Sequence, residues 1–238
     1  MAQYATDFRE YALNEQPSDF TQRWVARNWL VRERAGAKGG KVLESASVGS
    51  SIRAGLSWDK LDSDTEKDNF EMYFEFLFPE TGQSQDIFSL FEASGTAGNE
   101  TGWRAGVRNS DLNSARYTNG NFISAGSINQ PKVTSRGVPS AAYVQHVSGQ
   151  FKRIRTWALS SSEPTGWDIS RFSNIDPVGW MGLLSVAVGA VEVDFLGVGT
   201  GSDPAPRSLI SAGAPTLSKP TATSVSANSI GFKVPVTF

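Results

Sequence analysis

The chain of 238 residues has no cysteine, one histidine and three methionines. Without cysteine it cannot form a disulfide, a thiolate metal site or a cysteine nucleophile. Its 22 basic and 24 acidic residues nearly balance, so it lacks the positive excess that is typical of nucleic-acid-binding proteins. No apolar run approaches the roughly 20 residues of a membrane span, and the opening Met1–Arg9 is too polar for a signal peptide. We therefore expect no nucleic-acid partner and no membrane insertion.

Aromatic side chains are abundant, with 7 Trp, 14 Phe and 5 Tyr, which excludes a disordered chain. The length suffices to bury a core without disulfides or a structural metal. All seven tryptophans lie between Trp24 and Trp180, whereas the sequence after Gly201 is rich in Ser, Thr, Ala, Pro and Val. This shift predicts a folded domain over residues 1–200, a Pro/Gly/Ser linker over 201–220 and a short β tail over 221–238.

Before residue 200 the hydrophobic pattern has a period of two. In the run 70–78, one face carries only large apolar side chains, and the other carries Glu71, Tyr73 and Glu75. The apolar set is Phe70, Met72, Phe74, Phe76 and Phe78. Turn signals such as Asn119-Gly120 separate similar runs, and no stretch shows a convincing helical stripe. The predicted class is all-β, an antiparallel jelly-roll sandwich.

Further strands are expected at nine places along the chain. They are 21–32, 41–44, 51–57, 87–93, 103–108, 141–147, 151–159, 180–188 and 191–198.

Several short motifs occur in a recognisable order. They are Gln16–Trp24, Gly102–Gly106, Arg153–Trp157 followed by Glu163-Pro164 and Trp167, Gly179–Leu183, and Val191–Leu196. In this order the chain resembles the concanavalin A-like (laminin G-like) sandwich domains of bacteriophage virion proteins. The tail from Ala214 is similar to the opening strands of immunoglobulin-like or fibronectin-like modules. The resemblance implies a sandwich fold, a location in the virion and other virion proteins as partners, but no particular reaction.

Catalytic patterns are incomplete. Glucanases of this fold use Glu-x-Asp-x-Glu, and here Glu192 and Asp194 are followed by Leu196 where the third acid would stand. Polysaccharide lyases built on jelly rolls use a His, a Tyr and a Gln in one groove. The only histidine here, His146, would face away from Tyr143 and Gln145 in an extended strand, so the three could not act on one substrate. No Gly-x-Ser-x-Gly elbow is present. We therefore expect that the protein is not an enzyme.

One acidic run could hold a hard cation. It comprises Asp59, Asp62, Asp64, Glu66 and Asp68. An EF-hand loop that began at Asp62 would need Gly at position 67 and Glu at position 73. The chain has Lys67 and Tyr73 there, so the specific motif fails. A solvated loop is expected, with adventitious calcium as the alternative; no metal site and no cofactor are predicted.

A set of arginines and aromatic residues could share one sheet face. The candidates are Tyr73, Glu75, Arg104, Arg108, Arg153, Arg155 and Trp157. If their strands are neighbours, three interpretations remain open: a solvent face of ion pairs, a subunit interface, or a carbohydrate-binding surface.

The tail alternates as well, and its apolar positions could pair with a neighbouring chain. They are Ile230, Phe232, Val234, Val236 and Phe238. We expect a homo-oligomer, with a trimer favoured. The expected function is that of a non-enzymatic virion structural protein: a capsid decoration, fibre or tail-associated subunit. The alternative is a receptor-recognition domain that binds host surface polysaccharide.

Overall fold

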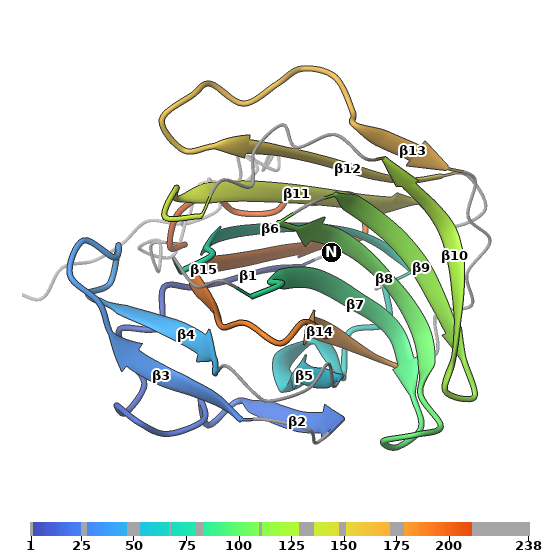
Figure 1. Ribbon diagram of the computed structural model, residues 1–238, viewed down its shortest axis with the longest axis horizontal. Helices are drawn as coiled ribbons and strands as arrows, with labels where there is room; N and C mark the ends of the chain where they lie inside the picture. Colours follow the sequence, from blue (N-terminus) through green and yellow to red (C-terminus); the bar gives the residue numbers. More distant parts are fainter. Residues whose placement is uncertain are drawn as a thin grey trace, which may run out of the picture.

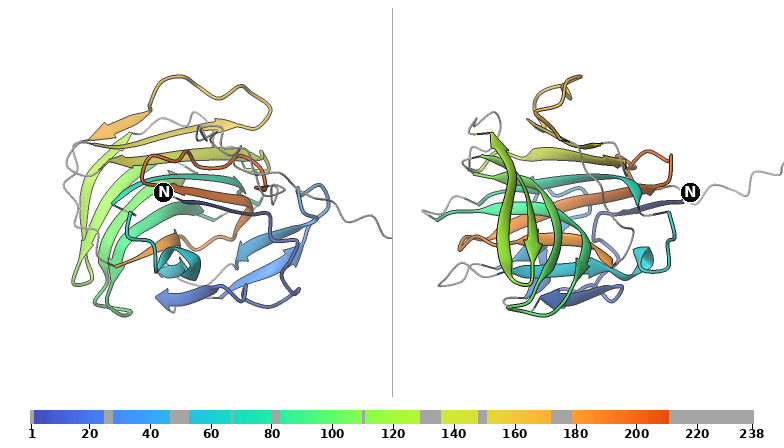
Figure 2. Two further views of the ribbon diagram at one scale, coloured as in Figure 1. Left: turned by 180° about the vertical axis from the view of Figure 1, so that it is seen from behind. Right: turned by 90° about the vertical axis from the view of Figure 1, so that its right-hand side faces the viewer.

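The computed structural model describes residues 2–24, 28–46, 53–66, 68–79, 83–109, 111–128, 136–147, 151–171 and 179–210. Two antiparallel sheets pack against each other, as Figures 1 and 2 show. The predicted all-β sandwich is therefore confirmed. Within the described ranges the only helix is one 3-10 turn at Asp59–Leu61, and no helix is long and apolar enough to cross a membrane.

Sheet A has the strand order β13-β12-β11-β6-β15-β4-β3, and β1 pairs with the second half of β15. Its strands are β1 (Ala2–Thr6), β3 (Trp29–Glu33), β4 (Lys41–Ser45), β6 (Asn69–Leu77), β11 (Ser140–Val147), β12 (Phe151–Ala158), β13 (Ile169–Arg171) and β15 (Val191–Thr200).

Sheet B has the order β10-β9-β8-β7-β14-β5-β2. Its strands are β2 (Phe20–Trp24), β5 (Ala54–Trp58), β7 (Asp86–Ser94), β8 (Thr101–Arg108), β9 (Leu112–Thr118), β10 (Asn121–Ile128) and β14 (Trp180–Ser185). In Figure 1, β8, β9 and β10 curve strongly along their length.

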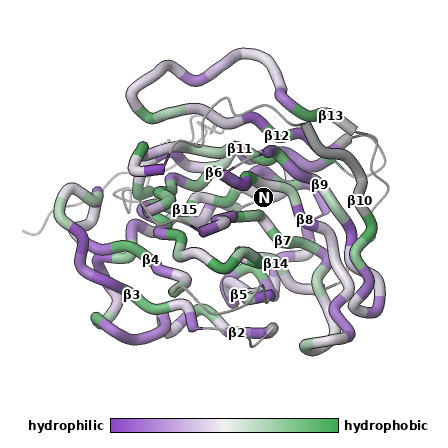
Figure 3. The backbone as a smooth tube through the Cα atoms, viewed as in Figure 1, coloured by the Kyte–Doolittle hydropathy of each residue, from purple (hydrophilic) through white to green (hydrophobic). Residues whose placement is uncertain are grey.

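The main core lies between the sheets. The apolar set predicted from the run 70–78 is buried there, each side chain at most 2% exposed, which confirms the predicted register. Figure 3 shows hydrophobic and hydrophilic positions interleaved along the strands of both sheets, as expected when alternate side chains point to opposite faces.

Two sequence-based expectations need correction. The single strand expected over 21–32 is two strands, β2 and β3, which belong to different sheets. Period-two alternation continues through both, so it cannot reveal where a chain leaves one sheet for the other. In addition, four strands were not expected: β1, β9, β10 and β13. β9 escaped notice because it places the polar Asn113 and Ser114 at buried positions.

The hairpin between β9 and β10 turns at Asn119-Gly120, where the sequence predicted a turn. Both residues have positive φ, 48° and 79°, which suits a type I′ turn.

Residues 201–210, the expected start of the linker, lie against sheet A. They approach so closely that a Cβ on Gly197 or Gly199 would come within 2.2 Å of a carbonyl oxygen of Pro206 or Asp203. These two glycines therefore allow the segment to lie flat on β15. Residues 211–238 are outside the described residues, as are the five apolar tail positions from Ile230 to Phe238, so the linker, tail and strand-pairing predictions remain predictions.

Candidate binding surfaces

The outer face of sheet A brings together five of the seven predicted site residues. Register places Arg155 opposite Tyr143, and Tyr143 opposite Tyr73. The next row along the strands pairs Trp157 with Ala141, and Ala141 with Glu75; Arg153 lies opposite Gln145 in the row on the other side. Tyr73, Glu75, Arg153, Arg155 and Trp157 thus share one surface.

This surface is largely covered by the protein's own chain. The Arg207 guanidinium lies 4.3 Å from the ring centroids of both Tyr73 and Tyr143. Arg207 also forms an ion pair of 3.0 Å with Glu163, which pairs with Arg155 as well. Covered in this way, Tyr73 is only 4% exposed.

The phenol and carboxyl groups beneath this cover are already paired. Tyr73 donates a 2.6 Å hydrogen bond to Glu75, and Lys38 contacts the same carboxylate at 2.5 Å. Burial, reinforced by the Glu75 hydrogen bond, raises the pKa of Tyr73 well above its ordinary value. Tyr73 therefore remains a neutral donor, and this part of the face is buried within the protein.

Arg104 and Arg108 do not join that surface. Both belong to β8 of sheet B, so the single face expected from the sequence is in fact divided between the two sheets. The reason is that alternation within a strand fixes which residues share its face, but not which strands become neighbours.

The outer face of sheet B carries a series of aromatic rings. Trp180 and Trp24 lie 5.2 Å apart, Trp24 and Tyr117 5.9 Å, and Tyr117 and Phe122 5.9 Å, between ring centroids. The middle rings are buried, Trp180 is 9% exposed and borders a cavity, and Phe122 is 46% exposed. The series is therefore exposed to solvent at Phe122 and borders a cavity at Trp180.

Three guanidinium groups lie against these rings and the neighbouring Phe88. Arg53 is 4.4 Å from the Tyr117 ring centroid, Arg104 is 4.2 Å from that of Phe88, and Arg108 is 5.8 Å from that of Phe88. We call this surface, defined by the four rings, Phe88 and the three arginines, the arginine–aromatic face.

Arg104 is the centre of this face and is fully buried. It donates to the Tyr117 hydroxyl at 2.6 Å and to the Asn113 side-chain oxygen at 3.0 Å, and both partners are neutral groups. Burial lowers the pKa of Arg104 to about 10, so it still carries its charge at neutral pH.

Two carboxylates accompany the arginines. Glu100 accepts a 2.5 Å hydrogen bond from Arg53, whereas Asp86 lies 3.8 Å from Arg108. Asp86 is 1% exposed and accepts from the Ser185 hydroxyl and from the backbone amides of residues 186 and 187. Both acids are therefore engaged within the protein.

A cavity of about 410 Å³ lies at the Trp180 end of the face. It is lined by Trp180 and Gly179, by the Ala93–Gly95 segment, and by Arg23 and Asp62, which form a 2.8 Å ion pair. An apolar ring beside a charged pair offers stacking and hydrogen bonding within one recess.

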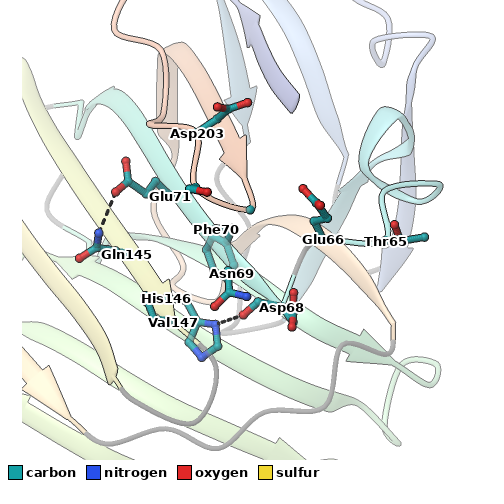
Figure 4. Close-up of a pocket in the computed structure, with 12 residues that line it drawn as sticks. Thr65, Glu66, Asp68, Asn69, Phe70, Glu71, Gln145, His146, Val147 and Asp203 are labelled. Carbon is teal, nitrogen blue, oxygen red and sulfur yellow. Dashed lines mark hydrogen bonds between the residues drawn. The ribbon is translucent and has the colours of Figure 1, made fainter. Parts of the chain in front are cut away.

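A larger, polar pocket of about 620 Å³ lies where β6 and β11 border the residue 201–203 turn (Figure 4). Glu71 accepts a 2.7 Å hydrogen bond from Gln145, and His146 contacts the Asp68 carbonyl at 2.8 Å through Nδ1. The His146 ring lies between Phe70 and Phe91, while Gln145 bonds to Glu71 on the opposite face of β11, as the sequence predicted.

The acidic candidates occupy separate places. Glu192 pairs with Arg34 at 3.1 Å, and Asp194 accepts from the Lys38 amide at 2.9 Å. Burial raises the pKa of both acids. Leu196, where the glucanase pattern has its third acid, is in the core.

In the acidic run, Asp59 accepts from Thr21, Asp62 from Arg23 and Asp64 from Thr200. Within the described ranges no three His, Cys, Asp or Glu side chains form a group that could hold a metal ion.

Sequence reasoning missed most of the arginine–aromatic face. Tyr117 and Phe122 flank the predicted Asn119-Gly120 turn, and this could have indicated two aromatic strand residues meeting across a hairpin. Trp24 on β2 and Trp180 on β14 are distant in sequence and meet only because both strands flank β5 in sheet B. No local pattern carries that information.

Comparisons with solved structures show the fold. The carbohydrate-binding module CBM66 of Bacillus subtilis aligns with a TM-score of 0.52 at 12% identity, covering 74% of this chain and 92% of the module. The exoplasmic/lumenal domain of VIP36 in its Ca²⁺/Man2-bound form gives 0.54 at 11% identity, covering 84% and 88%. A Shewanella oneidensis protein of unknown function, SO2946, gives 0.52 at 8%, covering 82% and 84%.

At these identities the likeness establishes a shared lectin-like jelly-roll sandwich. No protein-family model and no curated protein matches the sequence.

Proposed function

We propose that the protein is a non-enzymatic carbohydrate-binding sandwich whose ligand binds on the arginine–aromatic face of sheet B. The observation that carries this proposal is the series of four rings, which runs from the cavity beside Trp180 to the exposed Phe122, with guanidinium groups placed among them. An aromatic ring stacks on the apolar face of a sugar, and a guanidinium donates in-plane hydrogen bonds to its oxygens. The face supplies both.

The structural neighbours support this class of ligand. One is named as a carbohydrate-binding module, and another was solved in a Man2-bound form. Their likeness to this chain lies in the fold, so the proposal rests on the face itself.

The acids on this face favour binding over hydrolysis. Glycoside hydrolysis needs two carboxyl groups free to act on either side of the scissile bond. Here Asp86 is held by three hydrogen bonds and Glu100 by Arg53. Neither is free to donate a proton to a ligand or to activate water.

We also propose a location on a virus particle, on the basis of the sequence resemblance to phage virion sandwiches. Binding of host surface polysaccharide suits that location. Immunogold labelling of purified particles tests it: label on the particle surface is expected, and unlabelled particles from cells that express the protein would contradict it.

The binding proposal is tested with a polysaccharide array followed by titration of each positive sugar, with tryptophan fluorescence as the signal. Phe122→Ala removes a half-exposed ring and should weaken binding at least fivefold without unfolding the sandwich. Trp167→Ala is the control: this ring lies in the loop between β12 and β13, packs on the outer face of sheet A, and its loss should leave binding like that of the parent. Loss of binding in the control alone would move the site to sheet A, and an array without any positive sugar would refute the proposal.

A further inference from the structure

We infer that the cavity beside Trp180 binds one neutral hexose residue of the saccharide, and that two adjacent hydroxyl groups of this sugar meet Arg23 and Asp62. This inference rests on the proposed function and adds the chemical class of the ligand and the place of one sugar. Five observations carry it: the lining of the cavity, the position of the Trp180 ring, the accessible ion pair, the balance of charge, and the bulges in the surrounding strands.

The cavity has a volume of about 410 Å³ and lies at the Trp180 end of the arginine–aromatic face. This volume is within the usual range of small-ligand sites, about 300–1,000 Å³. The lining combines the indole ring and the ion pair with Ser94 and the backbone of Gly95 and Gly179. Glycine carries no side chain, so a ligand can approach the backbone closely at these two positions.

The Trp180 ring is fixed at the wall of the cavity. It packs edge-on against Trp24, with 5.2 Å between ring centroids and 71° between ring planes. Gly55 leaves room for this contact, because a Cβ at that position would come within 2.9 Å of the Trp180 ring. The indole N–H of Trp180 forms no hydrogen bond within the described ranges. The ring therefore offers a sugar an apolar contact and a free donor without first having to be ordered.

The Arg23–Asp62 pair supplies the polar contacts. The two side chains are 2.8 Å apart and are 37% and 36% exposed, so a ligand can reach both from solvent. Arg23 also donates through Nε to the Ser57 hydroxyl at 3.0 Å, which fixes the guanidinium plane. Its Nη1 has no hydrogen-bond partner among the residues that the structure describes. A guanidinium donor beside a carboxylate acceptor matches two adjacent hydroxyls, because each hydroxyl can both accept and donate.

The charges in the cavity favour a neutral sugar. Arg23 and Asp62 cancel, and the other lining residues of the described ranges are uncharged. Because Asp62 already neutralises Arg23, a uronate would find no unbalanced cation and would meet a like charge. An amino sugar would meet the like charge of Arg23. Like charges brought together weaken binding, so the cavity discriminates against both kinds of ionic sugar.

Two β-bulges border the cavity. On β2, Arg23 is an extra residue between the paired residues Gln22 and Trp24. On β7, one extra residue precedes Ser94 and shifts the pairing with both β14 and β8. A bulge re-aims side chains and is frequent next to active sites. These two bulges bring side chains from separate strands to one cavity.

The test compares neutral polysaccharides that differ in adjacent free hydroxyls. Dextran, linear 1,4-mannan and 1,4-galactan carry such hydroxyls in their main-chain residues, whereas a linear 1,3-β-glucan has none within its chain. Polygalacturonate and alginate complete the panel. At least one polymer of the first set should bind tenfold or more tightly than the 1,3-glucan. Its affinity should change less than twofold between 50 and 300 mM NaCl, because the ligand is uncharged.

Periodate treatment gives a second comparison on the same polymer. Periodate cleaves the bond between two carbons that carry adjacent hydroxyls, so oxidation followed by borohydride reduction should weaken binding at least tenfold. Binding confined to uronate polymers or to sugars without adjacent hydroxyls, or binding undiminished by periodate, would overturn this inference and leave the proposed function standing. Absence of binding on both the panel and the array would overturn both.

Variants locate the sugar in the cavity. Asp62→Ala removes the acceptor and should weaken binding of the neutral polymer at least tenfold. Ser94→Phe, at an exposed position, fills the cavity and should have the same effect. Glu44→Ala is the matched control, because it breaks the pair with Arg32 on sheet A, where the side chains are 24% and 36% exposed. This control should bind like the parent.

Circular dichroism melting checks that the three variants fold. A folded Asp62→Ala protein with affinity within twofold of the parent would overturn the assignment, and if that variant does not fold, Ser94→Phe decides in the same way. Phe122→Ala then separates the two proposals: a weakened Phe122→Ala protein beside unaffected cavity variants would keep the proposed function and refute this inference.

Discussion

Lys152 points into the space between the two sheets, where a charged amine is costly. It is 2% exposed, and its Nζ lies 3.3 Å from the Trp103 ring centroid with no hydrogen-bond partner within the described ranges. Burial lowers its pKa from 10.5 to about 7, and the charge of Glu92 only partly offsets this effect. We predict that Lys152→Met stabilises the protein.

The size of the effect follows from this pKa difference. At about 1.4 kcal/mol per pH unit, protonating the buried amine costs about 5 kcal/mol. Methionine fills a similar volume without a charge, so the free energy of unfolding should rise by about 5 kcal/mol near pH 6.

The gain should depend on pH in one direction. Below about pH 7, Lys152 is protonated in both the folded and unfolded states, and the full cost is present. Between pH 7 and 10.5 the folded protein releases the proton while the unfolded chain retains it, so wild-type stability rises with pH over this window. The advantage of Lys152→Met should therefore shrink toward zero by about pH 10.5.

Urea unfolding followed by tryptophan fluorescence at pH 6, 8 and 10 measures these differences. Lys60→Met is the control, because Lys60 is half exposed and pairs with Asp19 on the surface. Its free energy of unfolding should stay within about 1 kcal/mol of the parent, and the difference should not shrink in the same way as the pH rises. A destabilised Lys152→Met protein, or a gain that is the same at all three values, would refute the reasoning.

Three further outcomes are expected. Burial lowers the pKa of His146 to about 4, so the unfolded chain takes up a proton first and stability should fall by about 3 kcal/mol as the pH drops from 6.5 to 4; a titration midpoint near 6.5 in the single-histidine NMR signal would contradict this. Phe76→Ala should cost about 3–5 kcal/mol in urea unfolding, and a loss below about 1 kcal/mol would contradict its place in the core. Arg207→Ala, which loses its ring contacts and its ion pair with Glu163, should speed proteolysis within residues 201–210; an unchanged cleavage rate would argue against its covering role.

The sequence predicted well whatever depends on neighbouring residues. Phe70 to Phe78 alternate so regularly that their buried face followed from spacing alone, and the same logic placed His146 opposite Gln145. Strand neighbours were a different matter. Arg104 and Arg153 each lie on the expected face of their own strand, yet the strands belong to different sheets. Pairing between strands depends on contacts far apart in sequence, which a local period cannot contain.

The segment that covers the outer face of sheet A was equally hard to predict from the sequence. Pro204 and Pro206 suggested an extended segment, and the chain there is irregular, but its position on Gly197 and Gly199 could not be read from the sequence. The burial of Tyr73 depends on that placement. Lys152 is a similar case, because it is a charged residue that alternates with Arg153 and is buried on the inward side of β12. Tertiary packing decided both outcomes.

The position of β15 has a consequence for biosynthesis. This strand, at residues 191–200, hydrogen-bonds to β6, β4 and β1, so it fills the middle of a sheet whose other strands are synthesised earlier. Until it leaves the ribosome, β4 and β6 each present an unpaired edge and β1 has no partner among the described strands. Such edges attract other chains. A nascent or prematurely terminated chain is therefore prone to aggregation until β15 arrives, and fast translation of residues 191–200 would shorten the exposure.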